Sequence, residues 1–280
     1  MPELPEVETT AALVRPRLVG RRIIGEEVLW ARTLGGVRRA AFRKAVVGTT
    51  IVSVRRRAKQ VLIDLERDGE PAGSIAVHLR MTGRLYVDPS DEPLDPYVRV
   101  ALPLDDGRTL SFLDVRKFGR FVYVADPEAF LAHLGPEPLD DAFTPQVLWD
   151  ALRVKRRMIK PLLLDQTFLA GLGNIYVDEC LHRIRVHPER RANTVKRAQV
   201  FELHAAIQEV LHAAIARQGS SFDGFYRTPE GQPGNYQHEF RVYGKAGQPC
   251  PTCGAPIRRF VVGQRGTHAC LRCQRPPRRS

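Results

Sequence analysis

The sequence predicts an α+β multidomain protein: an N-terminal antiparallel β-sandwich with flanking helices, then a helical domain, then a C-terminal β-hairpin module. Short apolar stretches of strand character, separated by polar turns, fill residues 21–125, which is typical of an antiparallel sandwich. From residue 145 onward, apolar residues recur with helical spacing instead. Two close cysteine pairs lie in the last forty residues, which indicates a small module that depends on more than a hydrophobic core.

The composition fits a folded protein with a polyanionic partner. The chain has 280 residues, enough for two domains and a small appendage, and 43% of them are hydrophobic. The formal net charge is +12, and residues 241–280 hold nine Lys or Arg and no acid. Such a basic block favours nucleic acid as the partner. A solvated basic tail is the alternative, but the cysteines within the block argue for a folded module.

Neither a membrane span nor a signal peptide is visible in the sequence. No apolar run approaches the roughly 20 residues that a membrane-spanning helix needs. The N-terminus is acidic, whereas a signal peptide begins with basic residues and continues with an apolar run. We therefore expect no membrane association, a cytoplasmic location and, because no pattern indicates an oligomer, a monomer.

The predicted domain boundaries follow these changes in pattern. Residues 1–134 form the β domain, residues 135–144 a linker, residues 145–240 the helical domain and residues 241–280 the cysteine module. Within the helical domain, residues 219–237 contain four glycines and two prolines. A loop of this length is either a functional lid or simple disorder.

Apolar spacing indicates two helices, and residue types indicate the start of a third. One helix spans Val200 to Ile215. Thr144 with Pro145 has the residue types of a helix start. An N-terminal helix, ended by Pro16 and Gly20, has an apolar face with spacings of 4, 3 and 4 residues. That face consists of Val7, Ala11, Val14 and Leu18.

The strongest local signal is a pair of C-x-x-C motifs. Cys250 and Cys253 form the first pair, and after sixteen residues Cys270 and Cys273 form the second. This spacing predicts a tetrahedral Zn²⁺ site with four thiolate ligands, in which the ion is structural and folds a short hairpin. A redox pair or a chance arrangement is the less favoured alternative. Between the pairs, neighbouring glycines would let Arg265 project from a turn toward a phosphate.

The first eight residues, MPELPEVE, combine two prolines with three carboxylates. Removal of Met1 would expose Pro2 as a secondary amine, and an α-amino group has a pKa of about 8, so a useful fraction is unprotonated near neutral pH. Attack of this amine on an electrophilic sugar carbon would give a cationic iminium, and a neighbouring carboxylate could move protons. The alternative is an ordinary helix start, where proline and acids are favoured.

Two further regions carry residues suited to DNA. The segment DVRKFGR (114–120) places Phe118 among cations at an expected hairpin tip, and Met81 lies at a second expected tip. Apolar side chains there could wedge between stacked bases or simply pack under the turns. The run KRRMIK (155–160) precedes the glycine turn GLGN (171–174), where free N–H groups could bind phosphate; a solvated helix face is the alternative.

These segments together resemble the formamidopyrimidine-DNA glycosylase family. The resemblance covers the whole chain in order, and its motifs are specific. The related endonuclease VIII branch usually begins PEGPE, so Leu4 favours the formamidopyrimidine branch. The matching segments are PELPEVE (2–8), HLRMTGRL (78–85), DVRKFGR (114–120), IKPLLLDQTFLAGLGNIYVDE (159–179), EFRVYGKAGQPCPTCG (239–254) and QRGTHACLRCQ (264–274).

The resemblance implies a fold and an activity. The fold is a β-sandwich, a helix–two-turn–helix domain with a loop (219–237) that closes over an extruded base, and a four-cysteine finger holding one structural Zn²⁺. The activity is that of a bifunctional DNA glycosylase and abasic-site lyase of base excision repair. It removes oxidised purines (8-oxoguanine and formamidopyrimidines) from double-stranded DNA through a Schiff base and cuts the strand by β,δ-elimination. The location would be bacterial and nucleoid-associated.

The resemblance also implies roles for individual residues. Pro2 attacks C1′ of the damaged nucleoside, Glu3 donates a proton at the sugar, and Glu6 supports the site. Lys59 and Arg265 match the proton donors for β- and δ-elimination. A further group matches DNA-contacting positions: His78, Met81, Tyr97, Arg116, Phe118, Lys155, Lys160 and Asn174. Within this group, Met81, Arg116 and Phe118 match the trio that fills the gap and faces the orphaned base.

Three positions depart from the family pattern, and two other functions stay open. Val115 stands in place of a proline, Gln60 in place of an aromatic residue, and Tyr97 in place of a DNA-contacting histidine. The first alternative function is an endonuclease VIII-like glycosylase for oxidised pyrimidines. The second is a non-catalytic zinc protein that binds DNA in a salt-dependent way.

Overall fold

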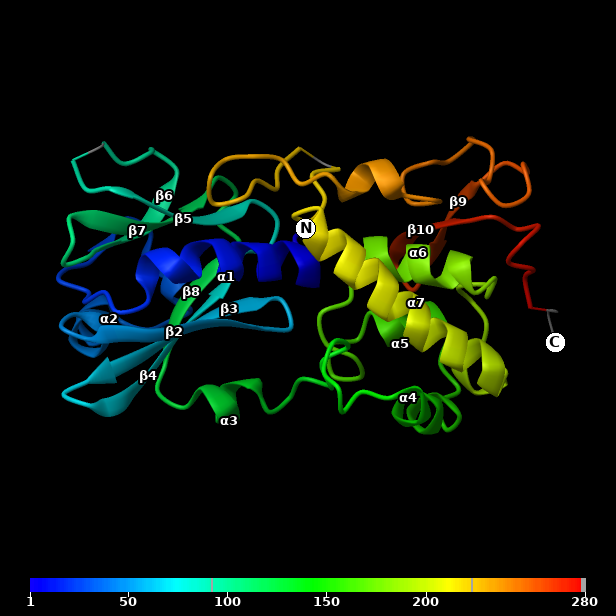
Figure 1. The fold of residues 1–280 in the computed structure, drawn as a ribbon, viewed down its shortest axis with the longest axis horizontal. Helices are drawn as coiled ribbons and strands as arrows, with labels where there is room; N and C mark the ends of the chain where they lie inside the picture. Colours follow the sequence, from blue (N-terminus) through cyan, green and yellow to red (C-terminus); the bar gives the residue numbers. More distant parts are fainter. Residues whose placement is uncertain (92, 223, 278–280) are drawn as a thin grey trace. The chain divides into compact units, whose positions relative to one another are not determined.

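The computed structural model describes residues 1–91, 93–222 and 224–277, and the chain divides into two compact units (Figure 1). The sandwich unit comprises Met1–His133 and Arg217–Asn235, and the helical–finger unit comprises Leu134–Ala216 and Tyr236–Ser280. Two features differ from the predicted division. The loop predicted within the helical domain packs with the sandwich unit instead, and the finger shares one compact unit with the helices.

The described residues of the sandwich unit form two four-stranded antiparallel sheets, which confirms the predicted fold class. The first sheet has the order β1-β6-β7-β5 and the second has the order β2-β3-β4-β8. The strands of the first sheet are β1 (Glu27–Val28), β5 (Gly83–Pro89), β6 (Val98–Pro103) and β7 (Arg108–Asp114). Those of the second are β2 (Thr50–Arg57), β3 (Gln60–Arg67), β4 (Glu70–His78) and β8 (Arg120–Val124).

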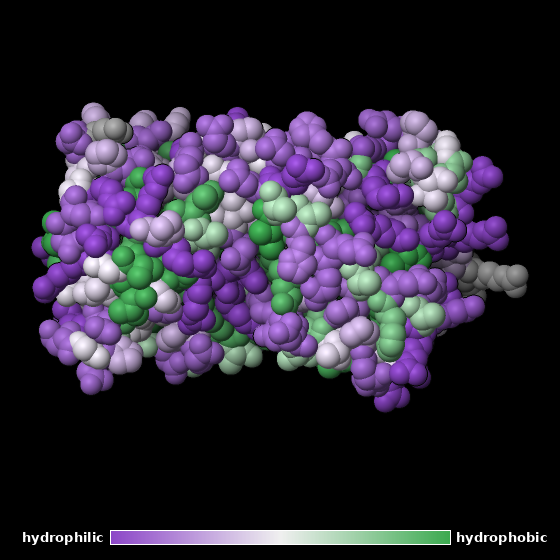
Figure 2. Space-filling model, viewed as in Figure 1, coloured by the Kyte–Doolittle hydropathy of each residue, from purple (hydrophilic) through white to green (hydrophobic). Residues whose placement is uncertain are grey.

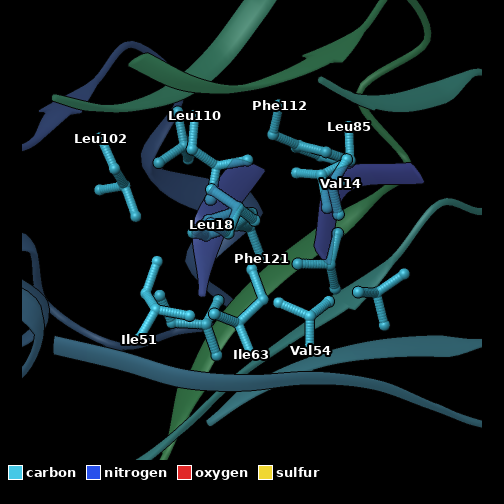
Figure 3. Close-up of a cluster of buried hydrophobic side chains, with 14 of the residues drawn as sticks. Val14, Leu18, Ile51, Val54, Ile63, Leu85, Leu102, Leu110, Phe112 and Phe121 are labelled. Carbon is cyan, nitrogen blue, oxygen red and sulfur yellow. The ribbon is translucent and has the colours of Figure 1, made fainter. Parts of the chain in front are cut away.

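Helix α1 (Leu4–Leu18) forms part of the core of the sandwich. Its predicted apolar face is confirmed, because Val7, Ala11, Val14 and Leu18 are all fully buried. Figure 3 shows Val14 and Leu18 of this helix between side chains that come from both sheets. Each large apolar side chain buried in this way stabilises the fold by about 1.5–3 kcal/mol. The shorter helices of the unit are η1 (Ala31–Leu34), α2 (Arg39–Val46) and α3 (Pro127–Leu131).

The turns around Met81 and Phe118 are corners between the sheets. Strands β4 and β5 belong to different sheets, and so do β7 and β8. The prediction of two hairpin tips was therefore wrong. Alternating apolar residues show where strands begin and end, but they do not show which sheet a strand joins. The chain crosses from one sheet to the other at both places.

The helical–finger unit is built from four α-helices and one hairpin among its described residues. Thr144 caps α4 as predicted, because its hydroxyl accepts a hydrogen bond from Val147 N at 3.3 Å with Pro145 in the first turn. The elements are α4 (Pro145–Leu152), α5 (Ile159–Leu163), α6 (Asn174–Arg183), η2 (Ala192–Thr194), α7 (Arg197–Ala216), η3 (Tyr236–Glu239), β9 (Arg258–Val262) and β10 (Arg265–Ala269).

Hydrophilic residues cover most of the face drawn in Figure 2, with small apolar areas between them. None of the helices in the described part of the chain has the length and apolar character required to cross a bilayer.

Candidate functional site

The start of α1 places two carboxylates directly after Pro2. Pro2 precedes the helix and is buried, and Glu3 and Glu6 are only 3% and 2% exposed. Glu6 accepts a hydrogen bond through Oε2 from Glu3 N (2.8 Å) and through Oε1 from Ser220 N (2.8 Å). A helix N-terminus stabilises negative charge because its first N–H groups point outward. Pro2 and two of the three predicted carboxylates, Glu3 and Glu6, are therefore buried at the start of α1, whereas Glu8 is half-buried.

Arg56 joins α1 to the turn that carries Lys59. Its Nε donates to Glu8 Oε2 at 2.8 Å, and its guanidinium also donates to Ala58 O at 3.2 Å. Ala58 has a positive φ of 52°, a conformation that costs energy for a residue with a Cβ and is common at functional sites. Lys59 follows it and is buried. The tight turn between β2 and β3 thus holds this lysine beside the N-terminal part of α1.

Cationic and polar side chains line up across the same end of the second sheet. The strand register pairs Arg57 with Gln60, Gln60 with His78, and His78 with Arg120. Both corners follow directly from this row, since β4 ends at His78 and β8 begins at Arg120. The sheet therefore gathers the predicted residues Lys59, His78, Met81, Arg116 and Phe118 at one end.

His78 is held in its neutral form. Burial lowers its pKa to about 3, with help from the nearby charges of Arg80, Lys59 and Arg120. Its Nδ1 accepts a hydrogen bond from Arg80 N at 3.1 Å, so the ring proton of the neutral form lies on Nε2. The ring can then donate to a phosphate oxygen without carrying a charge.

Asp114 joins the two corners and was not predicted from the sequence. Asp114 is 1% exposed, and its carboxylate accepts hydrogen bonds from the Thr82 hydroxyl and from the backbone N–H groups of Arg116 (3.3 Å) and Gly119 (2.6 Å). The Thr82 hydroxyl in turn accepts from Arg116 N at 3.2 Å. This network holds the Met81 corner against the Phe118 corner.

The corners present an aromatic ring to solvent. Phe118 is 52% exposed, and the Arg116 guanidinium lies 5.3 Å from its ring centroid. Met81 is partly exposed on the neighbouring corner. Gly119 is required after Phe118, because a Cβ there would meet the ring of Phe112 at 2.5 Å.

Tyr97 lies beside the same corners. It precedes β6, its carbonyl accepts from Asp114 N at 2.9 Å, and its ring is exposed. Arg99 fixes this arrangement by donating to Asp114 O at 2.8 Å, with its guanidinium 5.8 Å from the Tyr97 ring. A phenol hydroxyl at this position can hydrogen-bond to phosphate, as the predicted DNA contact requires.

The loop of residues 217–235 is anchored to the sandwich unit at several points. Besides Ser220, Tyr226 donates from its hydroxyl to Glu6 O at 3.3 Å. Arg84 donates to Thr228 O (3.1 Å) and Pro229 O (2.6 Å). Phe222 and Phe225, between the anchors, are more than half exposed. The structure therefore orders the described part of the loop, which favours the lid interpretation over simple disorder.

Gly219 explains why this loop can approach Glu6. Its φ is +79°, and a Cβ would lie 2.8 Å from Glu6 Cγ. Both conditions exclude larger residues. The glycine content of the segment indicated a loop. Glu6, the neighbour of Gly219 in α1, lies 213 positions earlier in the chain and could not be predicted from a local pattern.

The helical–finger unit holds the other predicted residues. Lys155 and Arg265 are exposed, as phosphate contacts require. Lys160 differs from this expectation because it is fully buried and pairs with Asp178. Asn174 opens α6 and donates through Nδ2 to Gly266 O at 2.8 Å, so its amide already has an acceptor within the protein.

The four finger cysteines form the predicted metal centre. The Sγ atoms of Cys250, Cys253, Cys270 and Cys273 all lie within 4.8 Å of one another. The separations are 4.0 Å for Cys250–Cys273 and 3.4 Å for Cys253–Cys270. A tetrahedral ion with Zn–S bonds of about 2.3 Å needs sulfur atoms about 3.8 Å apart, so the donor set fits one Zn²⁺.

Helix α6 supports the finger through side chains that the sequence did not single out. Glu179 accepts hydrogen bonds from the backbone N–H groups of Arg241, Val242 and Tyr243 at 2.8–2.9 Å. His182 lies with Nε2 3.3 Å from Cys250 Sγ, the usual position of an outer-shell partner of a metal ligand. The finger and the helix are therefore one structural unit.

Three family models match consecutive parts of the chain. They are the formamidopyrimidine-DNA glycosylase N-terminal domain (residues 1–121), the formamidopyrimidine-DNA glycosylase H2TH domain (residues 134–225) and the zinc finger found in FPG and IleRS (residues 247–276). This order of domains defines a DNA glycosylase of the helix–two-turn–helix, zinc-finger class.

Curated relatives and solved structures agree with this class. Formamidopyrimidine-DNA glycosylase of Symbiobacterium thermophilum is 44% identical over 99% of this chain and 90% of its own length, and that of Chloroflexus aggregans is 47% identical over 98% of both chains. The Lactococcus lactis enzyme non-covalently bound to DNA containing an abasic site superposes with a TM-score of 0.87 at 34% identity, covering 98% of this chain and 100% of that one. MutM in complex with carbocyclic 8-oxo-G containing DNA gives 0.89 at 35% identity, with the same coverage. The chain belongs to the formamidopyrimidine-DNA glycosylase family.

Proposed function

We propose that this protein is a bifunctional DNA glycosylase and abasic-site lyase that removes oxidised purines from double-stranded DNA. The observation that carries the proposal is the position of Pro2, directly before a helix start where Glu3 and Glu6 are buried. The relatives' shared name supports this substrate class, and so do the 8-oxo-G and abasic-site DNA bound by the solved neighbours.

The first step uses the terminal amine that is exposed once Met1 is removed. The Pro2 nitrogen lone pair forms a bond to C1′, and the bond from C1′ to the base breaks with its electron pair leaving on the base, which takes up a proton. The amine then loses its proton, and O4′ leaves C1′ with its electron pair and takes the proton that Glu3 donates. The product is an open-chain iminium, which acts as an electron sink.

The iminium allows both strand cuts. Loss of a C2′ proton expels the 3′-phosphate, and subsequent loss of the C4′ proton expels the 5′-phosphate; water then hydrolyses the iminium and frees Pro2. We assign Lys59, in the turn beside α1, to proton transfer in the first elimination and Arg265 of the finger to the second. Glu6 orders the site by binding both Glu3 N and Ser220 N.

The corners would keep the duplex open during this chemistry. Extruding a base costs a few kcal/mol, which a protein can offset by filling the gap with its own side chains. Phe118 and Met81 supply the apolar surface, and Arg116 supplies donors for the orphaned base. His78, Tyr97 and Lys155 are proposed phosphate contacts. We expect the protein to act as a monomer.

Trapping with borohydride tests the proposal. Reduction of the iminium on a duplex that contains 8-oxoguanine should yield a covalent protein–DNA adduct, whereas a non-catalytic zinc protein would yield none. Pro2→Gly should sharply reduce trapping and base release. Pro5→Ala, which alters a proline one turn away, serves as the matched control and should retain both. Preferential cutting of a thymine glycol duplex would instead support the pyrimidine-specific alternative.

A further inference from the structure

Lys160 and Asp178 form a buried ion pair that the proposed chemistry does not use. Lys160 Nζ lies 2.6 Å from Asp178 Oδ1, and both side chains are 0% exposed. A buried charge is unfavourable unless it is paired and its hydrogens have acceptors. Lys160 Nζ also donates to Gly266 O (3.1 Å) and Thr267 Oγ1 (2.9 Å), so three acceptors match its three N–H bonds.

Two of the acceptors of Lys160, Gly266 and Thr267, are the residues that follow Arg265 in β10. Gly266 O receives a second hydrogen bond from Asn174 Nδ2 at 2.8 Å. The Thr267 hydroxyl donates back to Arg265 O at 3.0 Å. Arg265 itself is exposed. Hydrogen bonds therefore hold the backbone at Arg265, while the Arg265 side chain stays exposed to solvent.

Asp178 extends the same network by one residue. Its Oδ1 binds Lys160, and its Oδ2 accepts from His268 N at 2.8 Å. One buried carboxylate thus orders both the lysine and the finger strand. Sequence patterns do not indicate this role, because an acid on a helix is usually solvated.

The other side of the finger turn is held by close packing. Gly263 and Gln264 both have positive φ, 55° and 64°, as a two-residue hairpin turn between paired Val262 and Arg265 requires. A Cβ on Gly263 would lie 2.7 Å from Pro161 Cγ. The residue after Lys160 therefore sets how closely the turn can approach α5.

We infer that Lys160, Asp178 and Asn174 position the finger turn and so fix the orientation in which Arg265 meets DNA. Lys160 is then a positioning residue and not a phosphate ligand, because no part of it is accessible to a phosphate in this structure. The inference rests on the proposed function, since it assumes that Arg265 contacts DNA and acts in the second elimination.

A double-mutant cycle separates positioning from direct contact. The probe is a duplex with a tetrahydrofuran abasic analogue, and the measurement is the slope of log affinity against log salt for Lys160→Met, Arg265→Ala and the double variant. Loss of one phosphate contact reduces that slope by about 1. If Lys160 acts through Arg265, the double variant should match Arg265→Ala. Additive losses, with a slope reduced by about 2, would overturn the inference.

Removing one partner of a buried pair can unfold a protein, so a second variant is needed. Lys160→Met combined with Asp178→Leu replaces the pair by apolar groups, a change that proteins often tolerate. Bound zinc and an unchanged thermal midpoint would show that the unit is folded. Arg183→Met is the matched control, because it removes a cation of α6 that pairs with Glu209 at 3.1 Å, away from the network around Lys160.

Amide hydrogen exchange gives a readout that does not depend on catalysis. In the Lys160→Met/Asp178→Leu variant, the amides of residues 265–268 should exchange at least about tenfold faster, while those of the control stay at the native rate. Native protection of these amides would overturn the inference even in an active enzyme. If Arg265→Ala changes neither binding nor the ratio of β- to δ-elimination products, the assigned role of Arg265 fails, and hydrogen exchange still decides the positioning.

Discussion

Glu6 and Ser220 are hydrogen-bonded, with Ser220 N donating to Glu6 Oε1 at 2.8 Å, although the two residues are far apart in the chain. The second carboxylate oxygen of Glu6 accepts from Glu3 N at the same distance. One buried side chain therefore connects the loop of residues 217–235 to the residue that follows Pro2. A change in the loop can reach the start of α1 through this carboxylate.

Glu6→Gln should impair base excision more than cleavage of abasic DNA. The amide keeps one acceptor oxygen, but its NH₂ group would face a backbone N–H, so one hydrogen bond to a charged acceptor is lost. Such bonds contribute about 1.5–3 kcal/mol, which corresponds to roughly 10- to 100-fold in rate. Single-turnover excision of 8-oxoguanine, compared with cutting of a pre-formed abasic site, measures the difference. Equal losses on both substrates would contradict a role for the loop connection.

Phe118→Ala and Asp114→Asn should have different effects on stability and activity. Phe118 is half exposed, so its removal should leave the unfolding midpoint nearly unchanged while excision falls. Asp114→Asn leaves Gly119 N facing an amide group in a buried corner, which should lower the free energy of unfolding by about 1–3 kcal/mol. Denaturant unfolding and excision rates of both variants test this. A large loss of stability in Phe118→Ala would contradict the assignment of that ring to the DNA.

His78 should make the free energy of unfolding fall in mild acid. Its pKa is lowered to about 3 in the folded protein, whereas an unfolded histidine titrates near 6.5. Below pH 6.5, His78 binds a proton in the unfolded chain but stays neutral in the folded chain. The contribution of His78 to the free energy of unfolding is therefore fully present above pH 6.5 and is lost progressively as the pH falls toward 3.

The His78→Gln variant isolates that contribution. The difference in free energy of unfolding between the native protein and the variant should change by up to about 1.4 kcal/mol for each pH unit below 6.5. The His78 ring, followed by NMR, should show no titration between pH 5 and 8. A midpoint near 6.5 would contradict the lowered pKa and the neutral state.

Cys270→Ser should remove the metal and weaken DNA binding while the sandwich unit stays folded. The finger has few apolar residues of its own, so its ligands supply much of its stability. The expected readouts are less than one zinc per chain, weaker binding to abasic DNA and a reduced yield of δ-elimination product. Cys180→Ser, which alters a buried thiol outside the metal centre, is the control and should retain full zinc. Full zinc content in Cys270→Ser would contradict the ligand set.

The features that the sequence predicted correctly depend on short spacings. The face from Val7 to Leu18 and the four cysteines each follow a local period, and the structure confirms both. The fold class follows from the change between strand and helix periods along the chain. These signals need no knowledge of the tertiary structure.

The features that were missed depend on contacts between distant segments. Asp114 could not be assigned to the corners without knowing that its strand and the next lie in different sheets. Lys160 lies in a basic run, where lysines are normally solvated, and its burial is explained by its distant partners Asp178, Gly266 and Thr267. The loop of residues 217–235 follows α7 of the helical–finger unit in the chain but belongs to the sandwich unit. No local sequence pattern predicts this change of unit.

The most direct test of the proposed function is to map the borohydride-trapped bond. The protein, with Met1 removed, is reduced on a duplex that contains 8-oxoguanine, digested and analysed by mass spectrometry. We predict that the sugar remnant is attached to the nitrogen of Pro2. Attachment to an internal lysine such as Lys59, or no adduct at all, would contradict the account.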